Sequence, residues 1–175
     1  GLKALLVVWA SLTSYAFAQE IQNRQISLAF VGDVMLARNV GKKIASLGID
    51  YPFSKTRRIL SSADIAFANF EGVLTGDRIT GSSKAFIFCS PPSFGETLVN
   101  GGIDIVSLAN NHANDGGTKG LVETIETLER LGIKYVGAGR NHFEARSLRI
   151  IEAKDKKIGF LAYTDLANIG LSAAS

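Results

Sequence analysis

The sequence predicts an α/β fold whose largely parallel sheet is covered on both faces. Short apolar runs alternate along the chain with stretches that have the three- and four-residue spacing of an amphipathic helix. The apolar runs end in polar residues, as buried parallel strands do where they meet loops. Glycine is frequent, with 18 of 175 residues, and proline is scarce, with 3, which suits many tight turns. A chain of this length, 46% hydrophobic and 20% charged, predicts a single globular domain.

Residues 1–18 are interpreted as a secretory signal peptide. Lys3 stands before an apolar run at 4–10, and Ala16-Phe17-Ala18 gives the small-residue pattern of a cleavage site. The run is shorter than the roughly 20 residues that span a bilayer, which disfavours a permanent anchor. The cleavage pattern favours removal of this segment over an uncleaved anchor or a buried helix. We therefore expect an exported protein of the periplasm, the cell envelope or the extracellular space. Residues 19–25 are expected to be a linker, and 26–175 the folded domain.

The first half of this domain is expected to alternate strand and helix. Leu36, Val40, Ile44 and Leu47 share one face of a helix, and Gly48 supplies its stop. The expected elements of this half are a strand at 26–31, a helix at 36–47, a basic helix at 53–61, a strand at 64–70 and a surface loop at 74–83.

The second half continues the alternation and closes with a hairpin. Pro91 and Pro92 suit the first turn of a helix, and Leu121, Ile125 and Leu128 mark one face of another. The expected elements are strands at 84–89, 103–108 and 133–136, helices at 91–100 and 118–131, and a hairpin of 148–153 with 157–163.

Three of the expected strands end in strongly polar motifs. Functional loops of a parallel sheet lie beyond the carboxyl ends of its strands, so these motifs are expected to share one site. Carboxylate, amide and imidazole groups suit divalent ions such as Mg, Mn, Fe or Zn, and a pair of such ions can promote phosphoester hydrolysis. The candidate residues, called the strand-end cluster below, are Asp33, Asn69, Glu71, Asn110, Asn111, His112 and Asp115.

Each of these residues taken singly also has a structural alternative. Asp33 could cap the helix that follows it, and Asp115 could cap the helix expected to start near 118. Glu71 could be a solvated turn residue, and the two asparagines of the third motif could bond their own loop backbone. His112 is one of only 2 histidines and has polar neighbours on both sides. The coincidence of all these groups at three strand ends favours a functional site.

Other features of the sequence point to weaker or excluded functions. The Gly137-Ala138-Gly139 loop is too short a signal for a dinucleotide site. Cys89 lies among apolar residues and is interpreted as a buried structural thiol; as the single cysteine it excludes an intrachain disulfide and a cysteine zinc cluster. His142 is expected in a surface turn. A net charge of +3 does not argue for binding of nucleic acid. The basic stretch 42–58 either forms a solvated face or attracts an anionic polymer.

Five motifs in this order resemble the CapA family of capsule-synthesis proteins, which is associated with poly-γ-glutamate biosynthesis and export. The resemblance extends over about residues 26–165. It implies the calcineurin-like metallophosphatase fold, a four-layered αββα sandwich, of which this chain would hold the N-terminal part. The motifs are FVGDVML (30–36), ANFEG (68–72), SLANNHANDGG (107–117), YVGAGRN (135–141) and IGFLAYTD (158–165).

The resemblance also implies roles within the strand-end cluster. Asp33 and Asn111 take the positions of metal ligands, Glu71 that of an acidic residue bridging two metals, and His112 that of the catalytic histidine. The chain departs from the superfamily at Met35, where a histidine is expected. The second motif reads Asn-Phe-Glu where the superfamily usually has Gly-Asp.

We therefore expect an exported CapA-like protein that acts in the synthesis or processing of poly-γ-glutamate or a related polymer. As a metal-dependent hydrolase it would bind metal through Asp33, Glu71 and Asn111. Its catalytic groups would be His112 and Asp115, supported by Asn69 and Asn110. Its expected partners are the anionic polymer or its synthesis and export complex, with membrane association through those partners. Two alternatives are a non-catalytic assembly or export subunit, suggested by Met35, and an unrelated phosphatase or nucleotidase of the same fold.

Overall fold

The structure is a computed structural model that describes residues 25–76 and 86–165. The expected signal peptide and nearly all of the expected linker lie outside these residues, as do most of the 74–83 loop and everything after 165. Within the described ranges, no helix is both long and apolar enough to cross a bilayer.

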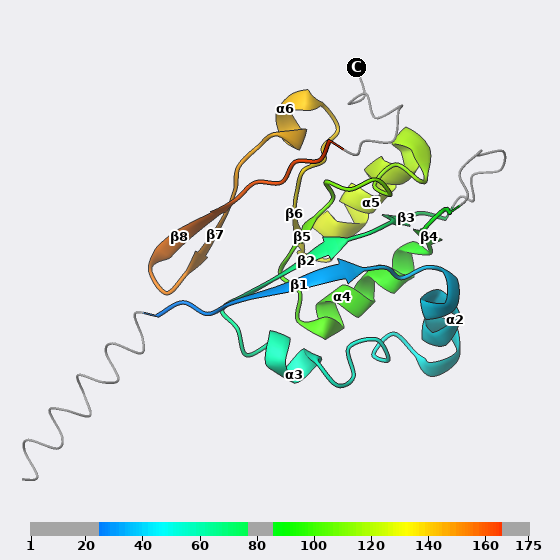
Figure 1. The fold of residues 1–175 in the computed structure, drawn as a ribbon, viewed down its shortest axis with the longest axis horizontal. Coiled ribbons are helices and arrows are strands. Elements are labelled where there is room, and N and C mark those ends of the chain that lie inside the picture. Colours follow the sequence, from blue (N-terminus) through cyan, green and yellow to red (C-terminus); the bar gives the residue numbers. More distant parts are fainter. Residues whose placement is uncertain (1–24, 77–85, 166–175) are drawn as a thin grey trace, which may run out of the picture.

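Four parallel strands form the central sheet, in the order β1-β2-β5-β6. The strands are β1 (Leu28–Val34), β2 (Ile65–Phe70), β5 (Ile105–Ser107) and β6 (Lys134–Val136) (Figure 1). This arrangement confirms the predicted α/β fold with a parallel sheet. Strand β1 runs further than expected, so Asp33 lies inside it, just after a shift in its register with β2.

Helices pack on one face of this sheet. Alternate residues of β2, Ala66, Ala68 and Phe70, point into the cluster of apolar side chains that the helices cover. Leu98 and Ile125 of these helices are fully buried there, so this face holds the main hydrophobic core. The helices are α2 (Arg38–Leu47), α3 (Arg57–Leu60), α4 (Glu96–Gly101) after the 3-10 turn η1 (Pro92–Gly95), and α5 (Gly117–Arg130).

A hairpin covers part of the opposite face. Strands β7 (Arg149–Ala153) and β8 (Lys156–Phe160) pair antiparallel, which confirms the predicted hairpin. The Phe67 ring of β2 stacks on Phe160, with centroids 5.8 Å apart and planes 7° from parallel. On the edge strand β1, Phe30 keeps 62% of its surface exposed. Cover on this face is therefore complete over the middle of the sheet and open at β1.

Several local predictions are wrong. The basic helix expected at 53–61 is only the single turn of α3, because turns precede it and the Ser54 hydroxyl bonds the Tyr51 carbonyl oxygen at 2.9 Å. Of the strand expected at 84–89, residues 84 and 85 lie outside the described residues and 86–88 are not in a strand. Cys89 begins β4 (Cys89–Ser90), which pairs with β3 (Val73–Leu74), where the 74–83 loop was expected to begin.

Two single residues also differ from expectation, although His142 is exposed as predicted. Cys89 is partly exposed rather than buried, since it belongs to this short edge pair. His142 begins the short helix α6 (His142–Ala145), whose start is capped by the Asn141 side chain accepting the Glu144 N–H.

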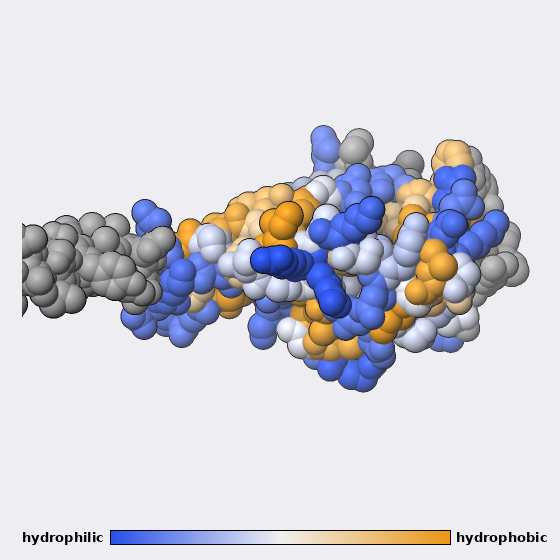
Figure 2. Space-filling view, turned by 90° about the horizontal axis from the view of Figure 1, so that it is seen from below, coloured by the Kyte–Doolittle hydropathy of each residue, from blue (hydrophilic) through white to orange (hydrophobic). Residues whose placement is uncertain are grey.

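The molecular surface carries apolar side chains in scattered positions. Figure 2 shows one face, on which hydrophobic and hydrophilic residues are interspersed. Ile59 of α3 and Leu47 of α2 are among the exposed large hydrophobic residues. Scattered exposed apolar residues are normal for a folded domain, so these single residues need no special function.

A polar contact joins the start of β1 to the hairpin turn. The Asp64 carboxylate accepts hydrogen bonds from the Ser27 N–H and hydroxyl, both at 2.8 Å, and lies 2.9 Å from Lys154 Nζ. These contacts lower the pKa of Asp64 from its usual 3.8 to about 2. The hydrogen bond from the Ser27 backbone N–H is the largest cause, and the contact with Lys154 is the next.

This contact predicts a pH-dependent contribution of Asp64 to stability. Because the folded-state pKa lies below the unfolded one, the stabilisation is complete above about pH 4 and is lost as the pH falls toward about 2. Asp64→Asn should therefore lower Tm at pH 7, and its Tm should converge with that of the wild type near pH 2. Asp155→Asn in the exposed hairpin turn is the matched control and should leave Tm unchanged. A Tm difference that stays constant from pH 7 to pH 2 would contradict a role for the ionised carboxylate.

Candidate functional site

The register of the sheet brings the three polar motifs to one edge. Asp33 of β1 pairs with Asn69 of β2, and Asn69 pairs with Ser107 of β5. The side chains continue this row: Asn69 Nδ2 donates to Asp33 Oδ1 at 2.7 Å, and Asn110 Nδ2 donates to Asn69 Oδ1 at 3.0 Å. Glu71 follows directly, with its N–H donating to the Val34 carbonyl at 3.0 Å. Members of all three motifs therefore meet through hydrogen bonds.

Asn110 holds the loop after β5 in place. It is buried, its Nδ2 also donates to the Phe70 carbonyl at 2.9 Å, and its Oδ1 accepts the His112 N–H at 3.0 Å. The last bond is the local loop bond that was considered as an alternative for this residue. The two Nδ2 bonds reach β2, so Asn110 also positions the loop against the rest of the cluster.

His112 is held through one of its ring nitrogens and through one face of its ring. Its Nδ1 lies 2.7 Å from Asp115 Oδ2, and that oxygen also accepts the Phe88 N–H at 2.7 Å. The Phe88 ring stacks on the imidazole, with centroids 4.0 Å apart. A carboxylate bonded to Nδ1 favours the tautomer with its proton on that nitrogen, which leaves the Nε2 lone pair available. Nε2 faces Glu71, whose Oε1 is 3.9 Å away.

The structure shows whether Asp33 caps the helix that follows it. Helix α2 begins after Ala37, which is its N-cap, and no side chain caps it. Asp33 is therefore not the cap; it lies in the strand and is exposed at the cluster. Met35, at the position where a histidine was expected, lies with its Sδ 3.0 Å from the Ala37 nitrogen, so its sulfur accepts the N–H that opens this helix.

Two residues near the cluster were missed by the sequence reasoning. Phe88 was assigned to a strand, although its ring packs on His112. Arg38 has a left-handed backbone with φ of 51°, and its guanidinium lies 4.9 Å from the centre of the Phe86 ring. A positive φ outside glycine costs of order 1–3 kcal/mol and is enriched at functional sites. Neither contact has a local signal in the sequence, because both cross from one segment to another.

The donor atoms at this edge determine which divalent metal the site could hold. Within residues 25–76 and 86–165, no three or more His, Cys, Asp or Glu side chains are grouped closely enough to hold an ion. The oxygen donors present at the edge are the carboxylates of Asp33 and Glu71 and the asparagine amides, with Asn111 partly exposed beside them. Magnesium is commonly held by one or two carboxylates while it keeps several waters. The donor set therefore fits a largely hydrated, oxygen-liganded ion.

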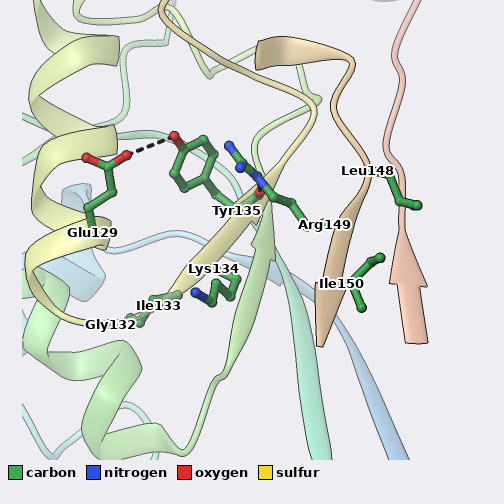
Figure 3. A pocket seen from close by; sticks show the side chains of 8 residues that line it. All are labelled: Glu129, Gly132, Ile133, Lys134, Tyr135, Leu148, Arg149 and Ile150. Atoms are coloured by element: carbon green, nitrogen blue, oxygen red, sulfur yellow. Dashed lines mark hydrogen bonds between the residues drawn. The ribbon is translucent and has the colours of Figure 1, made fainter. Parts of the chain in front are cut away.

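A pocket of about 380 Å³ lies at the start of β6, away from the strand-end cluster (Figure 3). The Tyr135 hydroxyl donates to Glu129 at 3.1 Å and also to Glu144, and the Arg149 guanidinium lies 4.8 Å from the centre of its ring. Burial raises the pKa of Tyr135, and the neighbouring carboxylate of Glu144 raises it further. Arg140 binds Glu129 at 2.7 Å. The charges here pair with one another, so we interpret this network as structural.

The role of Asn110 as an anchor can be tested through stability. Asn110→Ala removes partners from Asn69, the Phe70 carbonyl and the His112 N–H, and should lower the free energy of unfolding by roughly 1–3 kcal/mol. Asn100→Ala is the matched control, since it removes one exposed hydrogen bond, of 2.8 Å, to Asp50, and should cost less. Denaturant unfolding with an unchanged slope measures both values. Equal losses in the two variants would show that Asn110 is not a special anchor.

Comparisons with known proteins give consistent results. The capsule biosynthesis protein CapA of Bacillus anthracis is 27% identical over 165 residues, which are 92% of this chain and 40% of that protein. The PGA biosynthesis protein CapA of Bacillus subtilis is 25% identical over 168 residues, which are 95% of this chain and 44% of the relative. A probable polyglutamine synthesis accessory protein of Mycobacterium tuberculosis is 30% identical over 124 residues, or 69% of this chain and 32% of that protein.

The chain thus spans less than half the length of each of these relatives. The model of one family, described as bacterial capsule synthesis protein PGA_cap, matches residues 27–174. This match includes the whole sheet, the helices that cover it and the strand-end cluster. The chain therefore belongs to the bacterial capsule synthesis protein family PGA_cap.

Proposed function

We propose that this chain acts in the synthesis or processing of poly-γ-glutamate or a related capsule polymer, as part of an exported, metal-dependent hydrolase. The observation that carries the proposal is the pair of His112 and Asp115, which lies at the same sheet edge as the carboxylates of Asp33 and Glu71. The choice of polymer rests on the family match and on the names of the relatives. Contact with the polymer or with its synthesis and export complex belongs to the same proposal.

In this proposal His112 is the proton-transferring group. Asp115 holds the Nδ1 proton and Phe88 holds the ring plane, so Nε2 is fixed facing the Glu71 side of the site. From there it donates a proton to the leaving atom of the bond being cleaved, or removes one from the attacking water. Because Asp115 is buried and its Oδ2 is also held by the Phe88 N–H, the imidazole is oriented before substrate arrives.

Asp33, Glu71 and Asn111 are the residues that would hold a divalent ion. When bound, such an ion would polarise the scissile group and promote formation of the attacking hydroxide. The Asn69 amide donates to Asp33 Oδ1 and fixes that carboxylate at the edge. Its role is to position a ligand rather than to bind the ion itself.

For the whole protein we propose the four-layered αββα sandwich. The described residues supply one helical layer, the parallel sheet and a hairpin that covers only part of its second face. The exposed Phe30, together with Leu28 at 40%, marks where a further layer would pack.

A non-catalytic assembly or export subunit is a second candidate, and Met35 favours it. Its sulfur bonds the Ala37 N–H at the start of α2. The chain therefore uses this position for local structure, where the resemblance led us to expect a histidine. Such a subunit would keep the fold and bind polymer without turning it over.

Metal binding by the full-length protein tests the first part of the proposal. We expect saturable binding of Mn²⁺ or Mg²⁺ in calorimetric titration, weakened at least about tenfold by Asp33→Asn because a carboxylate ligand is lost. Asp155→Asn, an equal change of charge in the hairpin turn, should leave the affinity unchanged. Tight zinc or iron found by elemental analysis would correct the identity of the ion. Binding that is the same in all three proteins would contradict the proposed ligand.

Turnover tests the second part. With poly-γ-glutamate or an aryl phosphate as substrate, His112→Gln should lower kcat by about 10²–10⁴-fold, the usual contribution of a general acid or base. Asp115→Asn should also reduce kcat, because the imidazole loses its orienting carboxylate. Activity that survives both substitutions would refute the catalytic pair. Polymer binding without any turnover by the wild type would favour the non-catalytic subunit.

A further inference from the structure

A pocket of about 270 Å³ lies beside the strand-end cluster. Its walls come from the residues that follow β5 and β6, from α6 and from the segment after β8. Asn110 belongs both to this pocket and to the cluster, where it bonds Asn69. A ligand seated in the pocket would therefore lie next to the proposed catalytic groups.

Small residues make this pocket possible. Gly137 has φ of 81°, and a Cβ placed on it would lie 2.5 Å from Ala109 Cβ. A Cβ on Gly139 would lie 2.4 Å from the Ala145 nitrogen, so this glycine lets α6 approach the end of β6. The Gly137-Ala138-Gly139 loop thus has a clear structural task, and the space that it leaves is lined largely by alanines and glycines.

The charge of the pocket comes from Arg146. This residue lies just after α6 and lines the pocket together with His142 and Tyr163. Within the part of the chain that the structure describes, no acidic side chain pairs with the Arg146 guanidinium. Arg140, by contrast, binds Glu129 at 2.7 Å and Glu144 at 3.1 Å.

Arg149 differs from Arg146 in the same way. Its guanidinium lies over the Tyr135 ring (Figure 3). It is also 3.8 Å from Glu144. The acidic side chains near α6 thus pair with Arg140 and Arg149. Arg146 is exposed, lines the pocket and carries a positive charge that these acids do not neutralise.

We propose that this pocket is a subsite for a carboxylate group of an anionic polymer, with Arg146 as its specificity-determining residue. One guanidinium carries one full charge, which matches a single carboxylate, and its planar N–H groups suit two-point bonding to carboxylate oxygens. A polymer held there by one side group would be positioned beside His112 through the shared Asn110. The proposal rests on the proposed polymer substrate, but it does not depend on metal binding or on turnover.

Direct binding tests it. Fluorescence anisotropy of labelled poly-γ-glutamate with the full-length protein, in EDTA, measures affinity in the absence of metal chemistry. Arg146→Gln should weaken binding about 10–100-fold, the usual effect of losing charge-assisted hydrogen bonds, and Arg146→Lys should lose less because it keeps the charge. Arg130→Gln, an equal change of charge at the exposed end of α5 and outside the basic stretch 42–58, is the matched control and should leave the affinity within about twofold.

Each outcome is decisive for the subsite. Equal losses in Arg146→Gln and Arg130→Gln would indicate diffuse attraction by the protein charge and would overturn the proposal, as would a wild type that binds no polymer. Competition by inorganic phosphate but not by glutarate would overturn the carboxylate assignment. Arg146-dependent binding in a protein that shows neither metal binding nor turnover would support this subsite while the hydrolase proposal fails.

Discussion

The parallel pairing of β1, β2 and β5 is the constraint on which the rest of the site depends. It sets Asp33 opposite Asn69 and Asn69 opposite Ser107, and so lines up three strand ends that are distant in sequence. The hydrogen bonds from Asn110 to Asn69 and from Asn69 to Asp33 follow from this register. A shift by one residue would turn these side chains to the other face of the sheet and separate the polar groups.

Around this row, burial separates the groups that orient from the groups that stay accessible. Asp115 is buried and bonds both His112 and the Phe88 N–H, so it fixes the imidazole and the segment before β4 together. Asp33 is exposed and Glu71 is partly so. Such a combination gives an oriented imidazole beside carboxylates that water or a ligand can reach, which is what the proposed hydrolytic role requires.

Two pockets lie near the two ends of β6, and the charged groups around them are paired differently. At one end of β6, Glu129 and Glu144 are bonded to Tyr135 and Arg140. At the other end, the glycine loop opens a space lined by Arg146. The network of paired charges links α5, β6 and α6, and because the nearby acids are paired within it, the charge of Arg146 at the 270 Å³ pocket is not neutralised by them.

The sequence by itself determined the alternation of strands and helices, the hairpin and the seven residues of the strand-end cluster as candidates. These follow from apolar periodicity and from polar motifs after apolar runs, which are local patterns. Only the tertiary structure decided that Phe88 stacks on His112, that Met35 bonds the start of α2, and that Arg146 lines a pocket beside the cluster. The physical reason is that each of these facts depends on which side chains meet across the fold, and spacing along the chain carries no record of those contacts.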